Sequence, residues 1–169
     1  MANSPLGTKD RPYRVRLSLV NGESSSDISQ GDVVCFSSSD LGKVVLPATA
    51  TAVLATNLFA GVAASDAAPG QPVEIVAGGY CYQAKYVNRS RAASTDSAAA
   101  VASVAAGAAL TINTVYNGFE SSSAGGAALA LPAAVLLESI AAIVSITTAS
   151  TNSSTVTTSM VKVWVRALG

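Results

Sequence analysis

Regular alternation of apolar and polar side chains marks two segments near the ends of the chain. Over residues 14–19, three aliphatic side chains alternate with two arginines and a serine. Over residues 160–166, three valines alternate with a lysine, the only tryptophan and an arginine. A period of two predicts a half-buried strand at each place, with the valines facing inward and Lys162, Trp164 and Arg166 facing outward.

Shorter apolar runs between turn residues predict the other elements. Strands are expected at residues 31–36, 43–46, 73–76, 80–86, 108–115 and 135–146, with a further apolar run around Gly61 at 58–65. Gly78 and Gly79 predict a bend between two of these strands. Three segments remain: residues 49–58 are expected to form a helical turn or a strand, residues 88–106 a short helix or a mobile loop, and residues 147–159 an exposed hairpin tip.

These elements predict an all-β fold, a barrel or sandwich of short strands with at most one short helix. A faint internal repeat suggests two related β halves. Residues 31–34 are similar to 107–110, residues 60–64 to the run that begins at Ser139, and residues 73–76 to 161–164; chance similarity in alanine-rich sequence is the alternative. We expect residues 1–13 to form an N-terminal arm and residues 14–169 one β-rich domain. An internal boundary, if the halves are separate, is expected near residues 88–106.

Composition limits the chemistry of this fold. The chain has no histidine, and its charged residues amount to 12%, about half of the usual ~25%. Histidine is the side chain that most readily carries protons near neutral pH and the commonest metal ligand. We therefore expect no catalytic residue, no cofactor and no metal site, and an enzyme is only the third interpretation.

Individual acidic and thiol side chains have predicted structural roles. Asp32 and Asp66 are expected to make turn hydrogen bonds. Glu138, inside an apolar run, either pairs with a basic residue or marks the solvent-exposed face of its strand. Cys35 and Cys81 lie in separate apolar runs, and with no secretory signal at the start of the sequence we expect buried free thiols rather than a disulfide.

Net charge bears on partners. Ten basic residues balance ten acidic ones, so we expect no nucleic-acid partner. Pro132 and Glu138 interrupt the most apolar stretch, residues 127–146, so no membrane segment is expected.

Alanine supplies 32 of the hydrophobic residues, and each alanine adds little buried area. Part of the stability is therefore expected from contacts between subunits, in a trimer rather than a dimer.

The candidate partner-binding residues are basic or aromatic. They are Arg11, Arg14, Arg16, Tyr80, Tyr82, Tyr86, Arg89, Arg91 and Trp164. Alternation over residues 80–86 puts the three tyrosines on one face, and Cys81, Gln83 and Lys85 on the other. We expect the basic side chains to contact an acidic region of a partner protein, and the aromatic ones to anchor an interface. The alternatives are a solvated basic face and aromatic side chains in the chain's own core.

The order of motifs resembles a known family. Residues 31–36, 59–65 and 69–79, followed by the run from Ser139 and residues 160–166, are similar to the small capsid decoration, or cement, proteins of tailed bacteriophages. The likeness covers residues 28–87 and 135–167, and alanine- and serine-rich insertions at 88–106 and 121–134 depart from a compact member. It implies a homo-oligomeric structural protein, made in the host cytoplasm, that clamps major capsid protein subunits on the outer capsid surface of the virion. The alternative is a receptor- or glycan-binding β module on a phage or bacterial surface, in which the tyrosine face stacks on sugars.

Overall fold

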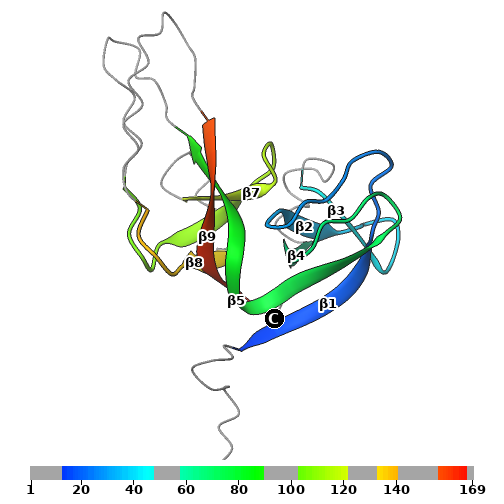
Figure 1. The fold of residues 1–169 in the computed structure, drawn as a ribbon, viewed down its shortest axis with the longest axis horizontal. Helices are drawn as coiled ribbons and strands as arrows, with labels where there is room; N and C mark the ends of the chain where they lie inside the picture. Colours follow the sequence, from blue (N-terminus) through cyan, green and yellow to red (C-terminus); the bar gives the residue numbers. More distant parts are fainter. Residues whose placement is uncertain (1–12, 48–57, 90–102, 122–132, 141–155, 167–169) are drawn as a thin grey trace, which may run out of the picture.

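The computed structural model describes residues 13–47, 58–89, 103–121, 133–140 and 156–166. These residues form nine strands and no helix, so the predicted all-β class is confirmed (Figure 1). The strands are β1 (Arg14–Asn21), β2 (Val33–Phe36), β3 (Lys43–Val45), β4 (Phe59–Ala63), β5 (Pro72–Arg89), β6 (Ala109–Asn113), β7 (Gly118–Ser121), β8 (Ala134–Leu136) and β9 (Val156–Val165).

The strands agree with the predicted ones except at four places. β7 has no counterpart in the prediction, because Gly118 and Glu120 interrupt its apolar pattern. β8 is shorter than the predicted strand at 135–146, and beyond it the pairing is a single bridge at Ile140. β9 already includes residues 156–159, where a hairpin tip is expected. Gly79 has a φ of 87°, as a bend requires, but β5 continues through it as one strand. Residues 48–57, 90–102 and 141–155, and the arm up to residue 12, lie outside the described residues.

The first half of the sheet is a closed circuit of pairing. β1 pairs with β3, β3 with β2, β2 with β4, β4 with β5, and the first part of β5 pairs again with β1. The second half repeats this order with β5, β7, β6, β8 and β9, and β9 pairs again with β5. Each circuit contains one parallel pair of strands. β1 and β3 are joined by only two residue pairs, and β5 and β7 by only one. The halves are thus two small, partly open barrels that share the long β5 (Figure 1).

Hydrogen bonds outside the strands match between the halves. The bridge of Ile28 with Ala67 corresponds to that of Val104 with Ile140. In the first half, the Gly31 N–H donates to Ala63 O at 2.8 Å; in the second, the Gly107 N–H donates to Leu136 O at 2.7 Å. Both glycines have a left-handed φ, 93° and 88°. The two halves are therefore structural repeats.

The register also corrects the alignment inferred from sequence. As expected, residues 31–34 correspond to 107–110, because Val33 pairs with Val62 as Ala109 pairs with Val135. Residues 73–76 likewise correspond to 161–164, because Ile75 pairs with Ala63 as Val163 pairs with Leu136. The middle match to the run at Ser139 is wrong. The segment that corresponds to residues 60–63 is 133–136, because β8 rather than the run after it pairs with β6.

Alternate residues of the first half face two different cores. Val34, Ala63 and Ile75 belong to a buried cluster made only of first-half residues. Their neighbours on the other face of the same strands, Val33, Val62 and Val76, belong to the second cluster, together with the core of the second half. The second half therefore covers one outer face of the first, and Phe59 packs edge-on against Phe119 across this boundary, with ring centroids 6.0 Å apart.

Polar contacts cross the same boundary. The Val33 N–H donates to Asn117 O at 2.9 Å, and the Lys85 N–H donates to Gly31 O at 2.8 Å. The Lys85 ammonium also pairs with the Asp32 carboxylate, whose side chain is only 5% exposed. These contacts hold the two halves in one fixed arrangement.

Candidate functional site

Two of the three predicted interface tyrosines lie together, and the third does not. Tyr80 and Tyr82 form an edge-to-face pair with ring centroids 4.5 Å apart, and Tyr82 is 45% exposed. Tyr86 is 2% exposed and belongs to the core of the second half. The prediction that all three share one face is wrong, because the pairing of β5 with β9 shifts register between Cys81 and Ala84. Such a bulge inserts one residue and moves the side chains after it to the opposite face.

Arg14 lies against this tyrosine pair. Its guanidinium carbon is 4.9 Å from the centre of the Tyr82 ring, within the range of a cation–π contact. Its Nη2 donates a hydrogen bond to the Tyr82 hydroxyl at 3.3 Å. Within the described part of the chain, no carboxylate pairs with Arg14. By contrast, ion pairs are formed by Arg16 with Glu74, Lys43 with Asp40, Lys85 with Asp32 and Lys162 with Glu138.

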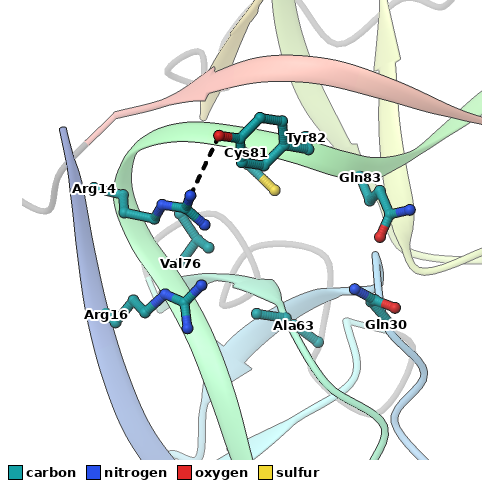
Figure 2. Close-up of a pocket in the computed structure, with 9 residues that line it drawn as sticks. Arg14, Arg16, Gln30, Ala63, Val76, Cys81, Tyr82 and Gln83 are labelled. Atoms are coloured by element: carbon teal, nitrogen blue, oxygen red, sulfur yellow. Dashed lines mark hydrogen bonds between the residues drawn. The ribbon is translucent and has the colours of Figure 1, made fainter. Parts of the chain in front are cut away.

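A small cleft of about 80 Å³ opens beside Arg14. Arg14 and Arg16 extend into it from β1, and Gln30 and Gln83 stand at its other side (Figure 2). Its remaining lining residues are Ala63, Ala64, Val76, Cys81 and Tyr82. The cleft therefore offers guanidinium and amide N–H groups and one aromatic ring over a floor of small apolar side chains, which suits a carboxylate or hydroxyl group of a partner.

The strands fix these side chains in place. Arg14 pairs with Gly79 across the first circuit, and Tyr80 pairs with Trp164 across the second. Arg14 and Tyr80 thus lie next to Gly79, where β5 bends between the two halves (Figure 1). Trp164 is 41% exposed, so the aromatic surface continues from Tyr82 through Tyr80 onto β9.

The other candidates are placed differently. Lys85, on the same strand as Arg89, pairs with Asp32. Arg89 ends β5, but its side chain lies outside the described residues, as do Arg11 and Arg91. The amides Gln30 and Gln83 were not among the predicted site residues. No local pattern marks them, since one precedes a turn glycine and the other lies in the bulge.

The acidic side chains largely have structural roles. Asp32 accepts from the Ser29 N–H, three residues away, at 2.9 Å, which confirms its predicted turn role. Asp66 accepts from the Gln30 N–H, 36 residues away, at 2.7 Å, so it joins two distant segments rather than closing a turn of its own, and its predicted turn role is wrong. Glu138 pairs with Lys162 at 3.3 Å and also accepts the Lys162 backbone N–H, so pairing with a basic residue is confirmed. This backbone hydrogen bond, with the nearby ammonium, lowers the pKa of Glu138.

The two cysteines are buried free thiols, as expected. Burial raises the pKa of Cys35 to about 12, and burial also raises the pKa of Cys81, which lines the cleft. Protonated thiols are poor nucleophiles. Among the described residues, no group of three or more cysteine or acidic side chains could hold a metal ion, and no helix is long and apolar enough to cross a bilayer.

No protein-family model matches the sequence, and no curated protein is significantly similar to it.

Proposed function

We propose that this chain is a structural virion protein that decorates and stabilises an icosahedral bacteriophage capsid by bridging major capsid protein subunits. The observation that carries the proposal is the Arg14–Tyr82 pair beside the cleft, a cation without a carboxylate partner among the described residues, stacked on an exposed ring. Arginine and tyrosine on a rigid scaffold are typical anchors of protein interfaces. In this proposal the chain works as a homo-oligomer, with a trimer favoured, on the outer surface of the virion, and catalyses no reaction.

The mechanism is non-covalent bridging. An acidic side chain of the shell enters the cleft, where Arg14 binds its carboxylate and the amides of Gln30 and Gln83 donate to its remaining oxygen lone pairs. The pairing of β1 with β5 holds Arg14 opposite Gly79, and Tyr82 lies on β5 next to the part that pairs with β9. Many weak contacts around a closed shell then add up to a large resistance against its opening.

The test measures binding to empty heads of a tailed phage that carries this chain. Sedimented protein is quantified against concentration for the unchanged chain, Arg14→Gln, Tyr82→Ala and the control Lys162→Gln. A hydrogen bond to a charged group contributes roughly 1.5–3 kcal/mol, or about 10- to 100-fold in affinity. We expect a loss of this size for the first two variants, and none for Lys162→Gln, whose exposed ammonium pairs with Glu138. Absence of saturable binding by the unchanged chain would refute the proposal.

A second candidate function is glycan binding on a phage or bacterial surface. It is favoured by one observation: the exposed Tyr82 ring adjoins Gln30 and Gln83, and sugars bind by stacking on a ring while their hydroxyl groups bond to amides. A glycan array distinguishes the two functions. Binding that Tyr82→Ala abolishes, together with no retention on phage heads, would favour the glycan module.

A further inference from the structure

Two arginines reach the cleft, but an acidic side chain neutralises one of them. Arg14 and Arg16 are two residues apart on β1, so both extend to the same side of the strand and both line the cleft (Figure 2). The Arg16 Nη1 lies 2.8 Å from a carboxylate oxygen of Glu74, whereas no carboxylate among the described residues pairs with Arg14. The residues that line the cleft include no acidic side chain. The two guanidinium groups and Glu74 together therefore carry one net positive charge instead of two.

The strands, rather than the ion pair, hold Glu74 at this place. Arg16 is opposite Val76 in the pairing of β1 with β5, so Glu74, two residues before Val76, is its diagonal neighbour on the same face. The Glu74 N–H donates to the Ser65 hydroxyl at 3.1 Å, and the Glu74 carbonyl oxygen accepts the N–H of Ala64, a lining residue of the cleft, at 2.7 Å. The backbone of Glu74 is thus fixed next to the cleft whether or not its carboxylate binds Arg16.

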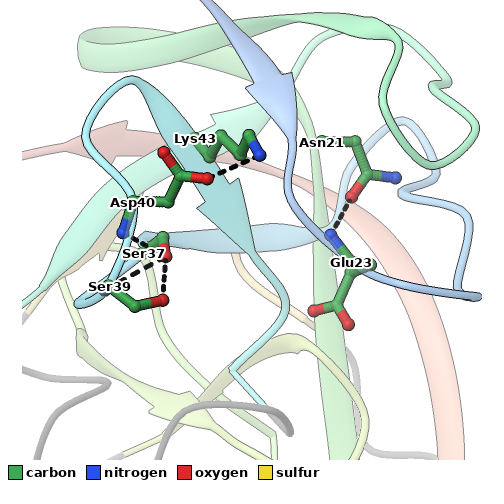
Figure 3. A network of polar contacts seen from close by, with 6 residues as sticks. All are labelled: Asn21, Glu23, Ser37, Ser39, Asp40 and Lys43. Carbon is green, nitrogen blue, oxygen red and sulfur yellow. Dashed lines mark hydrogen bonds and ion pairs between the residues drawn. The ribbon is translucent and has the colours of Figure 1, made fainter.

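The ion pair of Arg16 with Glu74 has no visible structural task. By contrast, Lys43 and Asp40 pair within the turn between β2 and β3, which the Ser37 hydroxyl also closes by accepting the Asp40 N–H at 3.2 Å (Figure 3). Within the described part of the chain, the Glu74 carboxylate has only the Arg16 guanidinium as a hydrogen-bond or ion-pair partner. Both side chains are about half exposed, and an exposed pair of this kind adds little to stability. What the pair changes is the charge of the cleft.

We propose that Glu74 sets the charge selectivity of the cleft, which binds the single carboxylate of an acidic side chain and disfavours a doubly charged phosphate or sulfate group. The inference rests on the proposed function for its partner, an acidic side chain of the shell. Attraction to the cleft grows in proportion to the charge of the incoming group, whereas the cost of removing water from that group grows with the square of its charge. One net positive charge matches a carboxylate, and two would be needed to match a dianion.

The other donors of the cleft fit the same ligand. The Tyr82 hydroxyl accepts an N–H of the Arg14 guanidinium at 3.3 Å and so holds its planar fork, which carries further N–H groups for a carboxylate. Gln30 and Gln83 add amide N–H donors from the other side of the cleft. Asp66 positions the first of these, because its carboxylate accepts the Gln30 backbone N–H at 2.7 Å. The volume of about 80 Å³ is less than three times the ~30 Å³ that one water molecule occupies in the liquid. One small charged group fits, so the choice between small anions depends on charge rather than on size.

The test measures the binding of acetate and of sulfate to the purified chain by nuclear magnetic resonance at constant ionic strength. The signals followed are the Arg14 Nε–H and the side-chain amide of Gln83, which both line the cleft. The unchanged chain is compared with Glu74→Gln and with the matched control Glu138→Gln. The control also raises the net charge by one and also removes the acidic member of an exposed ion pair, in this case with Lys162. The same spectra show whether each variant is folded.

We expect the unchanged chain to bind acetate more tightly than sulfate. Removing one charge at about 6 Å in water changes the affinity for a monoanion about 3-fold and the affinity for a dianion about 10-fold. Glu74→Gln should therefore strengthen the binding of acetate about 3-fold and that of sulfate about 10-fold, whereas Glu138→Gln should leave both unchanged. Tighter binding of sulfate than of acetate by the unchanged chain would overturn the proposal, as would equal effects of the two variants.

Arg16→Gln keeps the proposal testable should Glu74→Gln fail to fold. It leaves the Glu74 carboxylate beside the cleft without its cation, so both anions should bind more weakly and sulfate should lose more than acetate. An equal loss for both anions contradicts the proposal.

Acetate binding needs no phage heads, so the two proposals fail separately. A chain that shows the expected selectivity but does not bind heads refutes only the proposed function. A chain that binds heads without distinguishing acetate from sulfate refutes only this inference.

Discussion

Gly61 is the position at which one added methyl group should disturb the first half most. It lies in β4 with a φ of 146°, a conformation that side chains of L-residues rarely adopt. A Cβ atom here would be 2.3 Å from the carbonyl oxygen of Val76, which belongs to β5 and cannot turn aside without breaking the pairing of β4 with β5. Gly70 is a matched control, because its φ of 77° is also left-handed but no atom lies within 4 Å of the place that a Cβ would take.

The expected cost of Gly61→Ala follows from these two terms. A left-handed backbone costs a residue with a Cβ about 1–2 kcal/mol, and forcing a methyl group into a filled space costs about 1–3 kcal/mol more. Gly70→Ala carries only the first term. We therefore expect Gly61→Ala to lower the free energy of unfolding by about 3–4 kcal/mol and Gly70→Ala by about 1 kcal/mol.

Urea unfolding, followed by circular dichroism at one fixed protein concentration, measures both variants. The fixed concentration is needed because association adds to apparent stability. With a denaturant dependence of about 2 kcal/mol per molar urea, the two midpoints should differ by about 1 M. Equal midpoints within error would show that the close approach of β4 and β5 is not the constraint that we infer.

Two further predictions concern buried polar groups. Lys85→Met leaves the buried Asp32 carboxylate without its cation and should lower the free energy of unfolding by about 2 kcal/mol. The loss is smaller than for a fully buried pair because the Lys85 side chain is 23% exposed. The control Lys43→Met removes an exposed pair and should cost at most about 1 kcal/mol. Similar unfolding midpoints for the two lysine variants would contradict this reasoning. Burial raises the pKa of Cys35 from an ordinary value of 9.0 to about 12 in the fold, so the unfolded chain loses the thiol proton first as the pH rises. The free energy of unfolding should therefore be constant below about pH 9 and fall by about 1.4 kcal/mol for each pH unit above it. Thermal unfolding between about pH 8 and 11 checks this, and Cys35→Val should show a shallower decline; equal slopes would exclude the thiol as the cause.

Side-chain direction could be predicted only where the strands are regular. In β9, the inward valines and the outward Lys162 and Trp164 are placed correctly from the sequence, because nothing interrupts the period of two there. In β5 the same reasoning fails for Tyr86, since the bulge after Cys81 is set by pairing with β9 and leaves no mark in the local sequence. Gln83, which lies in this bulge, was missed for the same reason, and Gln30 was missed because it reaches the cleft from a turn far away in the sequence.

Local sequence was enough to predict the class of fold, the inward valines of the last strand, the burial of both thiols and the turn role of Asp32. These follow from local periodicity and from the hydrogen-bonding preferences of single side chains. It took the folded chain to reveal that β5 serves both halves, that Arg14 lies over Tyr82, and that Trp164 is exposed whereas its counterpart in the first half, Val76, is buried. Strand register and the contact between halves join residues far apart in the chain, and two alanine-rich repeats offer too few distinctive side chains to show that pairing beforehand.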